Sequence, residues 1–126
     1  MKDYKEIITN IIKELGIPAN LSGYHYIRCA VELLIDDIVL IKSITKVVYP
    51  MVAKRFDVTP TRAERAIRHA IELGWSRANE DMLMRLFGYS ISADKGKPTN
   101  SEFLATVADY ILMTYAHPTE KGGVDK

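Results

Sequence analysis

Residues 43–73 have the sequence SITKVVYPMVAKRFDVTPTRAERAIRHAIEL, which predicts two helices joined by a tight turn. The first helix is expected to open at Ser43, because the serine hydroxyl can accept a hydrogen bond from a free backbone N–H. It should continue to Phe56. Pro50 lies inside this segment and removes one helical hydrogen bond, so we expect either a kink or the start of a new helix there.

Two adjacent residues mark the start of the second helix. Thr59 is a suitable N-cap, and Pro60 suits the first helical position because its missing N–H is not needed there. The helix is expected to reach Leu73. Its inner face is small and apolar and consists of Ala63, Ala66, Ile67 and Ala70. Ala53 in the first helix would let the second approach closely, as a helix-turn-helix requires.

The outer face of this second helix is polar and mostly basic. Residues at steps of three and four project from it, namely Thr61, Arg62, Arg65, Arg68, His69 and Glu72, with Glu64 on the flank. The second helix of a helix-turn-helix enters the major groove, where an arginine fork matches guanine and a carboxylate can accept from cytosine. The pattern favours DNA recognition. An ordinary helical hairpin with exposed charges stays open as the alternative.

Charge is distributed unevenly along the chain, although the net charge is only +1. Residues 42–77 hold eight basic side chains against three acidic ones, a net charge of +5. The segments on either side are neutral or acidic. Positive charge gathered in one segment is what binding to a polyanion needs, while solvated helix faces are the alternative explanation.

The remaining sequence predicts an all-α fold of about six helices in a single compact domain. Helices are expected over about residues 3–15, from about Ser22, over 80–87, and from a capping box at 99–102 to about Tyr115. The DNA-binding unit should cover residues 1–116 and contain the helix-turn-helix at about 43–73. The Gly-rich segment 117–126 is expected to be a flexible tail.

Composition and scattered residues argue against several other classes of protein. A chain of 126 residues with 48% hydrophobic and 26% charged residues is typical of one soluble domain. Its apolar runs are too short for a membrane span, no signal peptide is expected, and a single cysteine, Cys29, fits a cytoplasmic location. The three histidines lack metal-ligand spacing, and no catalytic pair, triad or cofactor loop is found, so we expect no metal, no cofactor and no enzyme.

Six segments together carry a resemblance to a known family. They are GYHYIRCAVELLIDD, SITKVVYPMVAKRF, RAERAIRHAIE, WSRAN, LFGYS and KPTNSEF, in this order and spacing. They resemble the C-terminal effector domain of the master sporulation response regulator of endospore-forming bacteria, over about residues 5 to 115. The resemblance implies an all-helical regulator of sporulation initiation that binds double-stranded DNA at TGTCGAA-like promoter boxes and activates or represses transcription.

The resemblance also implies roles for individual residues. Base reading would fall on Arg62, Glu64 and Arg65, with neighbouring contacts at Thr61, Arg68 and His69. Residues 78–91 match the stretch that engages the RNA polymerase sigma subunit, which places Glu80, Asp81 and Arg85 on that surface. The family binds boxes as monomers or as tandem dimers, so a homodimer on tandem boxes is a further expected partner.

Two further surfaces are expected from the residues themselves. Lys46, in the first turn of the first helix of the motif, should meet the DNA backbone, as that helix does in this motif. Phosphate contacts are also expected at Lys97, Thr99 and Asn100, for which a loop and helix cap is an equally good explanation. The final helix has an apolar stripe wide enough for one edge, at Ala108 and Asp109, to pack against a second copy.

The sequence departs from the family in three places, of which one is the Gly-rich C-terminal segment, for which no counterpart can be placed. A phosphorylated receiver domain precedes the effector domain in the family, and the sequence is expected to lack one. Thr61 and Ala63 stand where serine and valine are expected in relatives. The competing hypotheses are a helical protein-interaction module whose basic surface has no specific DNA target, and an enzyme, for which no feature of the sequence argues.

Overall fold

The computed structural model describes residues 3–88 and 96–116, and in these ranges the chain is helical and forms no strand. The elements are α1 (Lys5–Glu14), α2 (Ser22–Asp36), the 3₁₀ helix η1 (Ile38–Ser43), the π-helix η2 (Ile44–Val48), α3 (Tyr49–Phe56), α4 (Pro60–Trp75), α5 (Glu80–Phe87) and α6 (Asn100–Tyr115). The predicted all-α fold is confirmed. The predicted tail at 117–126 lies outside the described residues.

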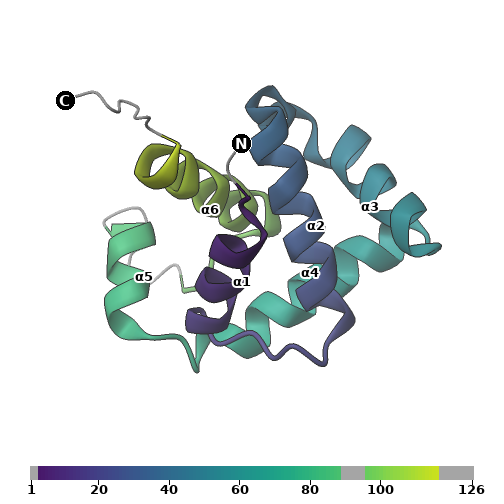
Figure 1. The fold of residues 1–126 in the computed structure, drawn as a ribbon. Helices are drawn as coiled ribbons and strands as arrows, with labels where there is room; N and C mark the ends of the chain where they lie inside the picture. The colour runs from purple at the N-terminus through teal and green to yellow at the C-terminus, as the bar shows by residue number, and fades with distance from the viewer. Residues whose placement is uncertain (1–2, 89–95, 117–126) are drawn as a thin grey trace.

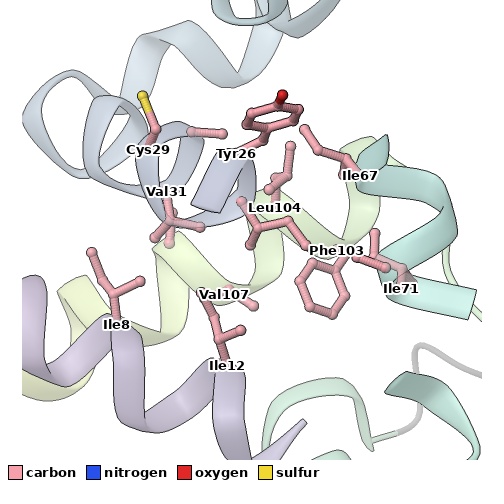
Figure 2. Packing of buried hydrophobic residues seen from close by; sticks show 14 of the residues in the cluster. Ile8, Ile12, Tyr26, Cys29, Val31, Ile67, Ile71, Phe103, Leu104 and Val107 are labelled. Atoms are coloured by element: carbon pink, nitrogen blue, oxygen red, sulfur yellow. The ribbon is translucent and has the colours of Figure 1, made fainter. Parts of the chain in front are cut away.

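Helix α6 supplies the centre of the hydrophobic core. Its residues Phe103, Leu104, Val107 and Ile111 are almost completely buried. Figure 2 shows Val107 facing the α1 residues Ile8 and Ile12, and Phe103 close to Ile71 of α4. Burying a large aliphatic or aromatic side chain contributes about 1.5–3 kcal/mol, so this cluster accounts for much of the stability of the domain.

The predicted pairing surface on α6 is wrong at Ala108. That residue has 0% of its surface exposed and belongs to the core, because helices pack around α6 on more sides than its apolar stripe suggests. An Ala108→Glu change would bury a charge and unfold the domain rather than weaken pairing alone. Asp109, the other residue of the predicted surface, is exposed.

The predicted start signals of α4 and α6 are both present in the structure. The Thr59 hydroxyl accepts a hydrogen bond from the N–H of Arg62 at 3.1 Å, with Pro60 at the first helical position. Thr99 and Glu102 form a complete capping box at the start of α6. The predicted short helix at 80–87 is present as α5, and the Asn79 side chain accepts from the N–H of Met82 at its start.

The segment before α3 differs from the prediction of one helix from Ser43 to Phe56. It forms the short 3₁₀ and π-helices η1 and η2, and α3 itself begins only at Tyr49, with Pro50 in its first turn. The Ser43 hydroxyl makes no capping hydrogen bond. Ser22 likewise starts α2 as its first residue without capping it, since the N-cap position is Leu21. Of the two outcomes expected at Pro50, the structure has the new α-helix.

Figure 1 shows α3 and α5 on opposite sides of the molecule, with α1, α2 and α6 between them. Helix α4 runs from the α3 side towards α5, so its first turns lie beside α3 and its last turn lies near α5. Rings tie α5 to its neighbours: Phe87 lies 5.3 Å from Trp75 and 6.0 Å from Phe103 between ring centroids. No helix in the described part of the chain is long and apolar enough to cross a bilayer.

Candidate nucleic-acid interface

Helices α3 and α4 are joined by the three residues 57–59, which form a closed turn. Asp57 adopts the left-handed conformation with φ of 58°, which aspartate tolerates better than most residues. The N–H of Val58 donates to the carbonyl of Ala53 at 2.9 Å, the closing bond of a Schellman motif. The phenyl ring of Phe56 lies 5.0 Å from that of Tyr26, which fixes the turn against α2. The structure therefore contains the predicted two-helix motif.

Helix α4 is held in place through its small inner face. Ala63, Ile67 and Ala70 are fully buried. Gly23 of α2 lies directly against the carbonyl of Ala66, so the backbones of α2 and α4 approach closely. The opposite side of α4 is exposed to solvent.

The predicted base-reading face is on that solvent side. Exposed residues there are Thr61, Arg62, Arg65, Arg68, His69 and Glu72. Glu64 is half-buried on the flank and forms an ion pair with Arg68, one helical turn further on. Arg62 and Arg65 form no ion pair with the described residues, so their guanidinium groups keep all their donors available for a ligand.

A second surface lies at the start of the motif, on η1, η2 and the first turn of α6. Its residues line a groove of about 370 Å³ and come from Ile41–Lys46 and from Ser101 at the start of α6. Lys42 and Lys46 are exposed. Lys46 lies in the π-helix η2, not in the first turn of an α-helix as predicted, yet it still precedes α3 on the exposed side of the chain.

The three residues predicted to contact phosphate, Lys97, Thr99 and Asn100, all form ion pairs or hydrogen bonds within the protein. The ammonium group of Lys97 lies 3.9 Å from the Glu72 carboxylate, and both side chains are about half exposed. Such a pair contributes little and can exchange for another anion. The Thr99 hydroxyl caps α6, which confirms the helix-cap explanation for this residue. Asn100 is half-buried, and its amide group bonds inside the protein.

Asn100 connects three helices across a groove of about 470 Å³ between α3, α4 and α6. Its side-chain nitrogen donates to the Tyr49 hydroxyl at 3.1 Å and to the backbone carbonyl of Glu64 at 3.0 Å. Burial raises the pKa of the Tyr49 phenol above its usual range, although the hydrogen bond from Asn100 opposes the shift. The phenol is therefore neutral at physiological pH. This contact is not predictable from sequence patterns, because Tyr49 and Asn100 are 51 positions apart in the chain.

The residues predicted to contact the sigma subunit form a separate exposed surface on α5. Glu80, Asp81 and Arg85 are all exposed, and Met84 between them has 67% of its surface exposed. Residues 89–91 of the predicted stretch 78–91 lie outside the described residues. Since α5 and α3 lie on opposite sides of the fold, this surface is separate from the start of the helix-turn-helix (Figure 1).

Cys29 is buried on α2, as expected for a core residue. Burial raises the pKa of its thiol, and the nearby Arg55 guanidinium only partly offsets the shift. The thiol is therefore protonated at neutral pH and a poor nucleophile.

A known protein family matches most of the chain. The model of the family described as "Sporulation initiation factor Spo0A C terminal" matches residues 8–111 of the 126-residue chain. The matched range starts inside α1 and ends inside α6, so it includes both helices of the motif and the whole of α5. The family resemblance predicted from the six sequence segments is confirmed.

Proposed function

Because this chain belongs to the family of the C-terminal domain of the sporulation initiation factor Spo0A, we propose that α4 reads TGTCGAA-like promoter boxes in the major groove. The family is that of a DNA-binding transcription factor domain acting in the initiation of sporulation, and it is not an enzyme family. DNA is therefore a partner of this chain. The box sequence, the reading residues and the contact with RNA polymerase belong to the proposal.

One observation carries the proposal. Arg62 and Arg65 stand one turn apart on the exposed face of α4, near its N-terminal end, and no described acidic residue pairs with them. The first turns of the second helix are the part of this motif that meets base edges. A planar guanidinium presents two parallel donors to O6 and N7 of guanine, and the TGTCGAA box contains guanines on both strands.

We propose that Glu64 contacts cytosine and that Arg68 orients it. Their ion pair sits beside the two free arginines and orients the Glu64 carboxylate on the flank of α4. A carboxylate held there can accept a hydrogen bond from the amino group of cytosine, and its charge opposes a phosphate in the same place. Thr61 and His69 complete the exposed face, while Lys46 and Lys97 supply charge for the DNA backbone.

A titration with two duplexes tests the proposal. One duplex carries a TGTCGAA box, and the other has the same bases in scrambled order. We expect the chain to bind the box at least about a hundredfold more tightly, and both affinities to fall steeply as salt rises, because bound phosphates release counterions. Equal affinity for the two duplexes at every salt concentration would remove the proposal and favour a basic module that binds a protein partner.

We further propose that the exposed face of α5, at Glu80, Asp81 and Arg85, contacts the sigma subunit of RNA polymerase. The support is the family resemblance of this stretch, its exposure and its separation from α3 (Figure 1). Asp81→Ala should reduce promoter activation in transcription with purified polymerase, yet leave box affinity within about twofold of the parent. Glu6→Ala is the matched control, since Glu6 is an exposed acid in the first turn of α1. Undiminished activation by the Asp81 variant would exclude this residue from the contact.

A further inference from the structure

We infer that Asn100 is a positioning residue for base recognition: its amide group fixes the part of α4 that carries the reading arginines. The inference rests on the proposed function of α4 and adds to it a residue that belongs to another helix. Asn100 is the first residue of α6 and is half-buried behind the exposed face of α4. It need not touch DNA to act in this way.

The geometry uses both protons of one amide nitrogen. The Asn100 side chain donates to the Tyr49 hydroxyl at 3.1 Å and to the Glu64 carbonyl at 3.0 Å. A carboxamide nitrogen carries two protons, so the two bonds can form together. A carbonyl oxygen has two lone pairs, which lets Glu64 keep its helical bond while accepting this second one. The single side chain thereby links α6, α3 and α4.

The contact bears on base recognition because of where the accepting carbonyl lies in α4. The Glu64 carbonyl belongs to the peptide unit that leads into Arg65, the central residue of the proposed reading face. Two bidentate contacts to base edges demand that both guanidinium groups be held within about 0.5 Å of their productive positions. A bond to this peptide unit restrains the axial rotation and the sliding of α4 where such errors matter most.

Neighbouring interactions do not replace this restraint. Among the residues that the structure describes, the ion pair of Lys97 with Glu72 also links α4 to the segment before α6. It lies two turns further along α4 and is half exposed. Water competes for such a pair, which makes it weak. The Tyr49 side chain, by contrast, is largely buried, so water competes little for its hydrogen bond with Asn100. Burial also raises the pKa of the phenol, which stays neutral at physiological pH and accepts from Asn100.

The test compares box and scrambled affinities for two variants of Asn100 in the whole chain. Asn100→Ala deletes both donors and should lower the ratio of box to scrambled affinity by about tenfold. Asn100→Asp keeps the size of the side chain but replaces the donors by acceptors, which repel the Glu64 carbonyl. An acid in the first turn also favours the helix, so this variant separates specificity from stability. It should lose as much of the ratio as the alanine variant.

Two controls make the result decisive. Thr114→Ala changes an exposed residue at the other end of α6, away from the groove, and should leave the ratio unchanged. Tyr49→Phe removes the hydroxyl alone; it should lower the ratio in the parent and have no further effect in the Asn100→Ala background, because the shared contact is then already lost. Circular dichroism and urea unfolding are recorded for each variant, and the ratio is measured where every variant is folded.

The possible results test the proposed function and the positioning role of Asn100 separately. A parent chain that does not distinguish the two duplexes removes the proposed function, and the role of Asn100 with it. A parent that distinguishes them, together with Asn100→Ala and Asn100→Asp variants that keep the full ratio, overturns the positioning role alone. An Asn100→Asp variant that behaves like the parent while the alanine variant fails would show that size, and not hydrogen-bond donation, is what α4 needs.

Discussion

Gly23→Ala is expected to lower the free energy of unfolding by about 3 kcal/mol, because an added methyl group has no room between α2 and α4. A Cβ at this position would lie against the Ala66 carbonyl oxygen, 2.8 Å from its carbon and 2.7 Å from the Cβ of Ala70. The contacts are mostly backbone and cannot rotate away. The helices themselves would have to move apart. Because Ala66 follows Arg65 in α4, the proposed reading face would shift as well.

Urea unfolding followed by circular dichroism measures this effect. Ser22→Ala is the matched control, since Ser22 is the exposed neighbour of Gly23 and makes no capping bond; it should change stability by less than about 0.5 kcal/mol. A Gly23→Ala variant with the unfolding midpoint and slope of the parent would show that α2 and α4 do not need this close approach.

The parts of the fold that were predictable from sequence are those specified by residues a few positions apart. The caps of α4 and α6 are formed by residues within one helical turn of each other, Thr59 with Pro60 and Thr99 with Glu102. Such caps can be recognised from the sequence alone. The two faces of α4 follow from spacing alone for the same reason. The exposed face of α4, which we propose reads bases, is therefore predictable from the sequence alone.

Segment 38–48 was not predictable in this way. It holds six residues of 3₁₀ helix followed by five residues of π-helix. The apolar residues in such short segments fit a 3₁₀ helix, an α-helix or a π-helix equally well, so their spacing does not predict which one forms. The choice depends on how the segment must cross from α2 to α3. A serine at position 43 is compatible with a cap, but the hydroxyl is not used as one.

Long-range contacts account for the other differences. An apolar stripe shows that α6 faces a core but not how far its neighbours cover it. The pairing surface predicted at Ala108 is therefore wrong, because this residue is buried. The bond between Asn100 and Tyr49 joins residues 51 positions apart, and neither sequence environment reveals it. Gly23 did carry a usable signal, since a glycine inside a helix is destabilising unless a close approach requires it.

Arg65→Ala is expected to remove specificity, with a loss of roughly 1–3 kcal/mol against the correct box and little change for the scrambled duplex. The side chain is exposed and unpaired among the described residues, so its loss leaves the fold intact. The physical reason is that a bidentate guanine contact exists only on the correct sequence. Box and scrambled affinities should therefore approach one another.

Lys46→Ala is the comparison that separates base reading from backbone anchoring. Lys46 is exposed in η2, before α3, and an ammonium on phosphate carries no sequence information. Its loss should weaken both duplexes alike and reduce the salt dependence by about one unit. If Arg65→Ala instead weakens both duplexes equally and Lys46→Ala changes their ratio, the two side chains have been assigned to the wrong partners.

The most direct measurement of major-groove reading by α4 replaces single guanines of the box by 7-deazaguanine. This base lacks the N7 acceptor but keeps its pairing edge and its minor-groove edge. At one guanine of the box, the substitution should weaken binding by the parent chain by about tenfold and have no effect on the Arg65→Ala variant, which has already lost that contact. Parent binding that is unchanged at every substituted guanine, or an Arg65→Ala variant that loses as much as the parent, would contradict the account.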